Sequence, residues 1–271
     1  RQSSLKRWGK IGSTISSNTA YLWGGGVINF DFGPAAISGS TISDNSASSG
    51  GGVNAYFGIM TITNSTISDN QAAFSGGGAR ADYGTVHLIN STLSGNQGSN
   101  GANVYGYFGM NLTGTVLSDP IGASNCAGSG VADGGGSLAD DASCDTVPDT
   151  LTGLDPVLAS NGGTTRTHAL EAGSTAIDAA GACGLATDQR GLLRGGACDA
   201  GAFERGALPA PEEVGGTVTG ASGRRVRCTN LRTGQVIEFP LMGATEWSCE
   251  ANGLVVAPGD LVRQQIVGAA D

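Results

Sequence analysis

Five polar residues in the second half of the chain have the side-chain types that acid–base chemistry uses: Asp178, Asp188, Arg190, Asp199 and Glu204. A glycoside hydrolase places two carboxyl groups, one protonated and one ionised, beside the sugar bond that it cleaves. A polysaccharide lyase places Ca²⁺-binding carboxylates beside a basic group that removes a proton. These residues are therefore the candidate catalytic set if the protein is an enzyme.

The same cluster also has a structural interpretation, which we prefer. Carboxylates and arginines can pair in a buried network, here one expected to close the last coil of the fold. The two histidines, His87 in an alternating strand and His168 in a polar motif, are expected to be structural. The sequence contains no nucleophilic triad motif, and its glycine triplets lack the following lysine and helix of a phosphate-binding loop.

A sequence repeat predicts the secondary structure of the residues that precede this cluster. A heptapeptide close to Gly-Ser-Thr-Ile-Ser-Asp-Asn recurs every 24 to 27 residues, at 12–18, 39–45, 64–70, 90–96 and 114–120. The segments between copies are short, rich in Thr, Ile and Val, and broken by glycine triplets, without helical spacing of apolar residues. A period of this length predicts an all-β fold, a right-handed parallel β-helix in which each repeat forms one coil.

Alternation along each Ser-Thr-Ile-Ser strand predicts which side chains face the interior. One apolar column is expected inside: Ile15, Ile42, Ile67 and Leu93. The flanking hydroxyl residues are expected outside: Thr14, Thr41, Thr66 and Thr92, with Ser16, Ser43, Ser68 and Ser94. The asparagines that follow are expected at a corner, hydrogen-bonded from coil to coil and tolerating left-handed torsions: Asn18, Asn45, Asn70 and Asn96. Second strands are expected at residues 60–63, 85–89 and 110–113.

The outward hydroxyls raise one minor alternative. Two exposed columns of hydroxyls on a flat sheet could bind ice, although a solvated hydroxyl ladder needs no ligand.

Charge excludes some classes of partner. The net charge is −9, and Arg80 is the only Lys or Arg between Ile11 and Thr165. Such a body repels nucleic acid and anionic lipid, so we expect neither a nucleic-acid partner nor membrane insertion. No cofactor is expected; Ca²⁺ at the corner aspartates is an open alternative to their role as turn formers.

Six cysteines occur as three close pairs, Cys126/Cys144, Cys183/Cys198 and Cys228/Cys249. None has the Cys-x-x-Cys spacing of a zinc or redox site, so we expect one disulfide within each pair. Disulfides indicate an oxidising, secreted or cell-surface location. The sequence has no signal peptide or transmembrane run and opens on Arg1, so we expect a leader to have been removed, with loss of earlier coils as an open alternative.

Five motifs follow the repeats, at residues 154–156, 161–170, 174–178, 188–191 and 198–204. In these motifs, residues 154–204 resemble the choice-of-anchor Q region of bacterial surface and secreted proteins. The resemblance implies the end of a right-handed parallel β-helix and implies no shared reaction.

The last 60 or so residues have a different pattern. A Pro-rich linker precedes about six short strands, at residues 216–219, 225–230, 235–239, 246–250, 254–256 and 261–267, which predict a small β-sandwich. Arg224, Arg225 and Arg227 form its basic cluster, with Arg225 and Arg227 on one solvated face.

The sequence therefore predicts β-helix coils over residues 1–122 and a disulfide-held excursion over 123–150. A terminal β-helix region over 151–206, a linker over 207–213 and the β-sandwich over 214–271 complete the chain. We expect a non-catalytic structural or adhesive module that binds cell-surface or matrix components, carbohydrate among them, and that could polymerise head to tail because the first coil has no evident cap. The alternative is a polysaccharide lyase or glycoside hydrolase.

Overall fold

The computed structural model describes residues 8–209, 215–217, 225–230, 232–240, 246–249, 252–255 and 262–267. The chain forms two compact units, Arg1–Ala207 and Leu208–Asp271, which are described separately. The described residues contain strands, turns and loops, and no α-helix.

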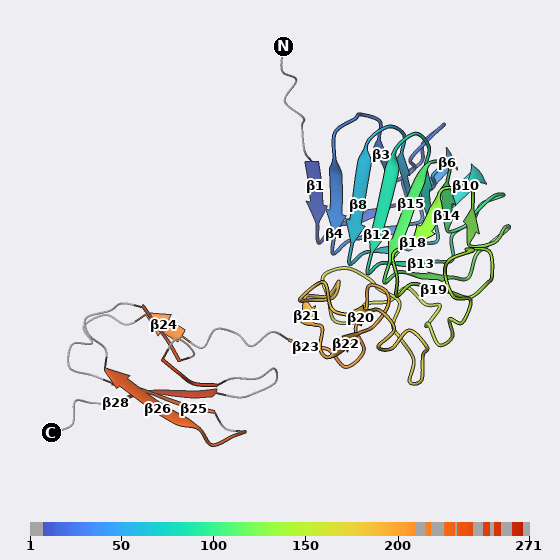
Figure 1. The fold of residues 1–271 in the computed structure, drawn as a ribbon. Helices are drawn as coiled ribbons and strands as arrows, with labels where there is room; N and C mark the ends of the chain where they lie inside the picture. The colour runs from blue at the N-terminus through green and yellow to red at the C-terminus, as the bar shows by residue number, and fades with distance from the viewer. Residues whose placement is uncertain are drawn as a thin grey trace, which may run out of the picture. The chain divides into compact units, whose positions relative to one another are not determined.

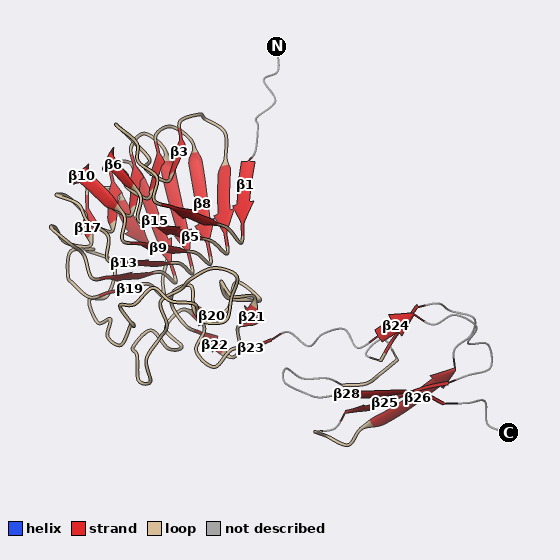
Figure 2. Ribbon diagram, turned by 180° about the vertical axis from the view of Figure 1, so that it is seen from behind, coloured by secondary structure: helices blue, strands red, loops and turns tan. Residues whose placement is uncertain are grey.

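Unit 1 is built on a parallel β-solenoid of about five turns, as the repeat predicts (Figures 1 and 2). Sheet 1 contains β1 (Trp8–Ile11), β4 (Ala35–Ser38), β8 (Ile59–Thr63), β12 (Thr85–Ile89), β15 (Gly109–Thr113) and β18 (Val131–Asp133). Sheet 2 contains β2 (Thr14–Ser16), β5 (Thr41–Ser43), β9 (Thr66–Ser68), β13 (Thr92–Ser94), β16 (Val116–Ser118) and β19 (Leu138–Ala139). Sheet 3 contains β3 (Val27–Asn29), β7 (Val53–Ala55), β11 (Ala79–Ala81), β14 (Val104–Gly106) and β17 (Cys126–Ala127). A short sheet 4 pairs β6 (Ser46–Ser49) with β10 (Gln71–Ser75).

The apolar column inside the solenoid is confirmed. Ile42, Ile67 and Leu93 are fully buried, and the parallel register places Ile42 opposite Ile67 and Ile67 opposite Leu93. Ile15, in the first coil, is partly buried against the same core. Sheet 1 supplies a second buried column, which includes Ile62 and Leu88 in neighbouring coils. In-register stacking of identical residue types is what lets one short repeat fill the core of every coil.

An asparagine ladder runs along the corner after sheet 2. The Asn45 amide donates to Asn70 Oδ1 at 2.9 Å, and the Asn70 amide donates to Asn96 Oδ1 at 3.0 Å. The ladder begins at Asn18, which donates to Asn45 Oδ1. The coil-to-coil bonding is therefore confirmed. The left-handed torsion, however, falls one residue earlier, at positions such as Asp44 and Asp69 (φ 58°).

The glycine triplets form the corner between sheets 4 and 3. The first glycine of each triplet has a positive φ, as at Gly50 and Gly76. The second leaves no space for a side chain, because a Cβ on Gly51 would lie 2.4 Å from the carbonyl oxygen of Gln71. Both observations explain why glycine recurs at this corner.

The expectation that the hydroxyl columns of sheet 2 face solvent holds for Thr14, which is exposed in the first coil, but is wrong for the next three coils. Their side chains point away from the core, yet Thr41, Thr66 and Ser68 are fully buried. Residues 151–207, which we call the covering segment, lie across the outer face of sheet 2. The Thr66 hydroxyl donates to Gln189 Oε1 at 2.6 Å, and the Ala202 amide donates to Thr92 Oγ1 at 3.0 Å. A buried face cannot present a flat hydroxyl array to ice.

Residues 123–150 also differ from the expected excursion. They add β17, β18 and β19 to sheets 3, 1 and 2, and so form a further short coil. The Cys126–Cys144 disulfide and the buried side chain of Val147 join the solenoid core at this end.

The covering segment folds back alongside the coils instead of extending them (Figure 1). It contains β20 (Gly181–Ala182), β21 (Leu192–Leu193) and β22 (Ala197–Cys198), with β20 and β22 antiparallel. The Cys183–Cys198 disulfide links the residue after β20 to the last residue of β22. Bonds to residues as far apart as Thr41 and Thr92 show that the segment spans several coils.

Unit 2 contains β23 (Leu208–Pro209), β24 (Gly215–Thr217), β25 (Arg225–Asn230), β26 (Val236–Pro240), β27 (Glu246–Ser248) and β28 (Val262–Val267). Two antiparallel sheets, β24–β27 and β26–β25–β28, agree with a small β-sandwich, and Cys228–Cys249 is bonded as expected. Leu254 and Val255 are not in a strand; residues 210–213, 218–219, 256 and 261 and Arg224 lie outside the described residues. Arg225 and Arg227 share one face, where both pair with Glu238.

Candidate functional site

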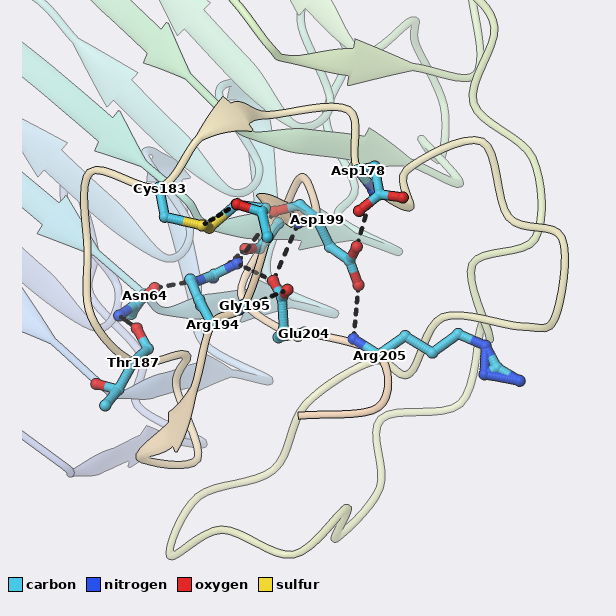
Figure 3. Close-up of a disulfide and its surroundings, with 12 residues drawn as sticks. Asn64, Asp178, Cys183, Thr187, Arg194, Gly195, Asp199, Glu204 and Arg205 are labelled. Atoms are coloured by element: carbon cyan, nitrogen blue, oxygen red, sulfur yellow. Dashed lines mark hydrogen bonds and ion pairs between the residues drawn. A yellow bond between two sulfur atoms is a disulfide. The ribbon is translucent and has the colours of Figure 1, made fainter. Parts of the chain in front are cut away.

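Four of the five candidate catalytic residues lie together in the covering segment, where they surround an arginine that the sequence did not single out. Figure 3 shows this arginine, Arg194, between Asn64 and Glu204. Arg194 Nη1 lies 3.0 Å from Glu204 Oε2, and its Nη2 donates to Asn64 Oδ1 at 3.0 Å and to the Gly201 carbonyl at 2.7 Å. The Arg194 side chain has no exposed surface. We call Asp188, Arg190, Arg194, Asp199 and Glu204 the arginine–carboxylate network.

The carboxylates of this network accept hydrogen bonds from backbone amides. Asp199 accepts from the amides of Asp178 and Arg205, and Glu204 Oε2 accepts from the Asp199 amide at 3.0 Å. These bonds fix the loop between β22 and residue 205, as Figure 3 shows. A carboxylate held in this way orders backbone and has little freedom to exchange a proton with a substrate.

Asp188 and Arg190 form the second half of the network. Their side chains are paired at 2.7 Å, and Asp188 also accepts from the amides of Arg190, Leu192 and Glu204. The Arg190 guanidinium lies 3.7 Å from the ring centre of Phe203. A cation stacked on a ring and paired with a buried carboxylate is held rigidly.

Burial dominates the electrostatics of the network. Burial raises the pKa of Glu204, and the nearby charge of Asp199 raises it further, while Arg194 and backbone amides oppose the rise. Burial likewise lowers the pKa of Arg194, although Glu204 and Asp188 oppose this. Both shifts favour the neutral forms in spite of the 3.0 Å ion pair, so desolvation offsets much of the Coulombic attraction.

Asp178 is set apart from its four partners. Its side chain is exposed, and the structure links it to Asp199 through its backbone amide. Asp178 also has a positive φ of 60°, which is a turn conformation.

The network lies against the side of the solenoid. Arg194 bonds the Asn64 side chain, and the neighbouring Gly201 amide donates to the carbonyl of Gly114. The expectation that the network closes the last coil is therefore corrected.

A shallow cavity of about 300 Å³ borders the network. Its lining includes Asn64, Asp188, Gln189 and Arg190, with Ile11 and Gly39 of the solenoid. Asp188 is the only carboxylate that the described residues contribute to this lining, so the cavity lacks the second carboxyl group that sugar hydrolysis needs.

His168 and Ser68 form a pair that resembles a nucleophile and its base. His168 Nε2 lies 2.9 Å from Ser68 Oγ, and Nδ1 lies 2.9 Å from the Asp155 carbonyl oxygen. Because a carbonyl oxygen only accepts, Nδ1 donates there. The single proton of the Ser68 hydroxyl is shared between two acceptors within reach, His168 Nε2 and Asp69 Oδ2, which lies 2.8 Å away. Both side chains are buried, and burial lowers the pKa of His168. The pair anchors the covering segment to sheet 2, and substrate has no access to the hydroxyl.

The other histidine, His87, is half-buried on sheet 1, and its Nδ1 lies 3.4 Å from the side-chain amide nitrogen of Asn111.

The outer face of sheet 3 carries a smaller polar cluster around Arg80. Arg80 pairs with Asp82 through Nε at 2.9 Å and also bonds Ser75. Asp82 accepts from Asn54, whose Oδ1 has no hydrogen-bond partner. The Arg80 guanidinium lies 4.6 Å from the ring centre of Tyr105.

An aromatic ridge lies beside this cluster, in the turns that join sheet 3 to sheet 1. It consists of Phe30, Phe32, Tyr56, Phe57, Tyr83, Tyr107 and Phe108. Phe32 is 74% exposed and Phe108 is 62% exposed, which is unusual for a row of large apolar side chains. Trp23 contacts this ridge through Phe30 and Tyr56.

The sequence interpretation missed the ridge and Arg194 for different reasons. The ridge has a readable signal, because an aromatic residue followed by glycine recurs at the repeat period, as in Phe57-Gly58, Tyr83-Gly84 and Phe108-Gly109. Arg194 stands among glycines and small residues without a pattern, and its burial depends on contacts with distant coils.

Among the described residues, no group of three or more His, Cys, Asp or Glu side chains is arranged to hold a metal ion. No helix in the described part of the chain is long and apolar enough to cross a membrane. The corner aspartates Asp44, Asp69 and Asp119 occur in three of the coils, while Ser17 and Gly95 take the same position in two others. Asp69 accepts from Ser68 at 2.8 Å.

No family model matches the chain, and neither a curated protein nor a solved structure matches it. The resemblance of residues 154–204 to the choice-of-anchor Q region, and the bacterial origin that it implies, therefore remain expectations from the sequence.

Proposed function

We propose that the protein is an extracytoplasmic structural or adhesive module that binds its partner without cleaving it. The observation that carries this proposal is the state of the arginine–carboxylate network. Asp188, Asp199 and Glu204 are buried and accept backbone amides, and Arg194 ties them to the coils. Such residues are suited to fastening the covering segment to the solenoid.

The location rests on the disulfides. All three cysteine pairs are bonded, and no free cysteine occurs. Disulfides persist in oxidising compartments, which supports a secreted or cell-surface protein.

A polysaccharide lyase or glycoside hydrolase is the second candidate function. The cavity beside Asp188 and Arg190 favours a lyase over a hydrolase, since two candidate catalytic residues line an open space and only one of them is a carboxylate. A lyase acting on an acidic polysaccharide would also need cationic groups, and between Ile11 and Thr165 Arg80 is the only one, paired with Asp82.

One experiment separates the two functions. The purified chain and its Asp188→Asn and Glu204→Gln variants are incubated with neutral and acidic polysaccharides, and new reducing ends and unsaturated products are measured. We expect no product from any of the three proteins and lower thermal stability for both variants. Product released by the parent and lost in stably folded variants would establish the enzyme instead.

We further propose that copies associate end to end. Among the described strands, β1, β2 and β3 each pair on one side only, and such edges accept additional strands. Light scattering over a wide concentration range should give a mass that rises with concentration. A constant monomer mass would contradict this association.

A further inference from the structure

The aromatic ridge is a preformed surface. Neighbouring ring centroids lie 4.7 to 6.3 Å apart, as in Tyr56–Phe57 and Tyr83–Tyr107. Some pairs are nearly parallel, such as Phe30 and Tyr56 at 13°, and others are perpendicular, such as Tyr56 and Phe57 at 90°. Since the rings support one another, they lose little conformational freedom when a ligand binds.

The ridge is long and narrow because it follows the solenoid axis. It occupies four successive turns, those before β4, β8, β12 and β15. With strands about 4.8 Å apart, four turns span roughly 14 Å. The surface therefore fits an extended chain better than a compact molecule.

The polar groups of the ridge indicate what kind of chain it fits. Three of the seven rings are tyrosines, whose hydroxyls need hydrogen-bond partners when a ligand covers them. Arg80, which is partly exposed and paired with the buried Asp82, adds a charged donor beside Tyr83. A purely apolar partner would leave the tyrosine hydroxyls unpaired, whereas a chain with apolar ring faces and many hydroxyls would satisfy them.

The charges around the ridge further restrict the class of ligand that it can bind. Arg80 is compensated by Asp82, and Asp31 stands between two ridge residues, Phe30 and Phe32. The acidic body would repel nucleic acids and acidic polysaccharides.

We infer that the aromatic ridge binds an extended, uncharged polysaccharide. This inference rests on the proposed adhesive function and names its partner class. The exposed rings pack against the C–H faces of the sugar rings. The tyrosine hydroxyls and the Arg80 guanidinium hydrogen-bond to the sugar hydroxyls.

Affinity electrophoresis of the full chain tests the inference, with hydroxyethylcellulose, glucomannan or polygalacturonate cast in the gel. We expect retardation by one or both neutral polymers and none by polygalacturonate. The double variant Phe32→Ala/Phe108→Ala removes the two most exposed ridge phenylalanines and should weaken binding at least about tenfold. Tyr83→Phe keeps the ring, removes a hydroxyl and should weaken binding less.

The matched control is Phe74→Ala. Phe74 lies on β10, is 65% exposed and takes part in none of the ring contacts among the described residues. It should bind as the parent does, and thermal unfolding should show every variant to be folded. Three results would overturn the inference. They are an equal loss of binding in Phe74→Ala, no loss of binding in Phe32→Ala/Phe108→Ala, and retardation by polygalacturonate alone.

Two outcomes separate this inference from the proposed function. Cleavage of a bound polymer would refute the non-catalytic function, while ridge variants that lose retardation would still support the binding surface. Absence of retardation by both neutral polymers, with self-association that Phe32→Ala/Phe108→Ala abolishes, would assign the ridge to a second copy of this chain and overturn the inference alone.

Discussion

At the scale of single residues, each buried asparagine of the corner ladder has several partners. Asn70 donates to the Ile42 and Ser68 carbonyls and to Asn96, and it accepts from the backbone and side-chain amides of Asn45. Buried polar groups that lose their partners each cost about 1–3 kcal/mol, so the ladder specifies the corner as well as stabilising it.

Asn70→Ala should therefore lower the free energy of unfolding by about 3 kcal/mol or more, because several buried groups lose a partner together. Asn18→Ala is the matched control, since Asn18 occupies the same corner in the first coil but is exposed. Its cost should stay below about 1 kcal/mol, because water replaces the lost bonds. Chemical denaturation measures both, and equal costs would contradict a buried ladder.

His168 makes the stability of unit 1 depend on pH. Burial lowers its pKa below the ordinary value of 6.5, while the charges of Asp69, Asp119 and Asp155 oppose the shift. As pH falls below 6.5, the unfolded chain binds the proton before the folded chain does. The stabilising contribution is therefore complete above pH 6.5 and decreases as the pH falls towards the lowered pKa.

The difference in unfolding free energy between the parent and His168→Gln should accordingly shrink on acidification, with denaturation measured from pH 7.5 to 5. Taking the difference between the two proteins cancels the pH-dependent contribution that the other titrating groups make to both. A difference that is constant across this range, or that grows in acid, would show that the pKa of His168 is not lowered.

Alternation along a strand predicted the buried column of Ile42, Ile67 and Leu93, because facing is a local property of β-structure. It could not predict the burial of Thr66 or Ser68, since their partners, Gln189 and His168, lie at least 100 residues away. Nothing local distinguishes a hydroxyl that faces water from one that faces a covering segment.

At the scale of elements, the covering segment has little regular structure and is held by polar contacts. Arg194 reaches the Asn64 side chain on the solenoid, and Gln189 donates to Thr41 and accepts from Thr66. A small apolar cluster also packs Leu154 and Leu170 of the segment with Val116 of the solenoid. The candidate residues were predictable as a polar cluster, but their attachment to particular coils was not.

A double-mutant cycle on Arg194 and Glu204 tests whether this network is structural. Arg194→Met or Glu204→Gln alone leaves a buried partner uncompensated and should cost about 3–5 kcal/mol. The double variant should cost clearly less than the sum, because neither charge remains buried without its partner. Thermal and chemical unfolding measure the cycle, and additive costs would contradict direct coupling.

At the scale of the whole molecule, the solenoid has one face that is covered by its own chain and another that is exposed. Sheet 2 is covered and fixed by polar bonds, whereas the turns between sheets 3 and 1 expose the aromatic ridge. The repeat predicted the solenoid because each coil uses the same local rules. The division of its surface into covered and open faces depends on contacts that the repeat does not encode.

Chromatography with light scattering after prolonged incubation of the full chain with hydroxyethylcellulose is the most direct test of binding without cleavage. We predict that protein co-elutes with the polymer and that the molar mass of the polymer does not change with time. A polymer mass that falls during the incubation would contradict binding without cleavage.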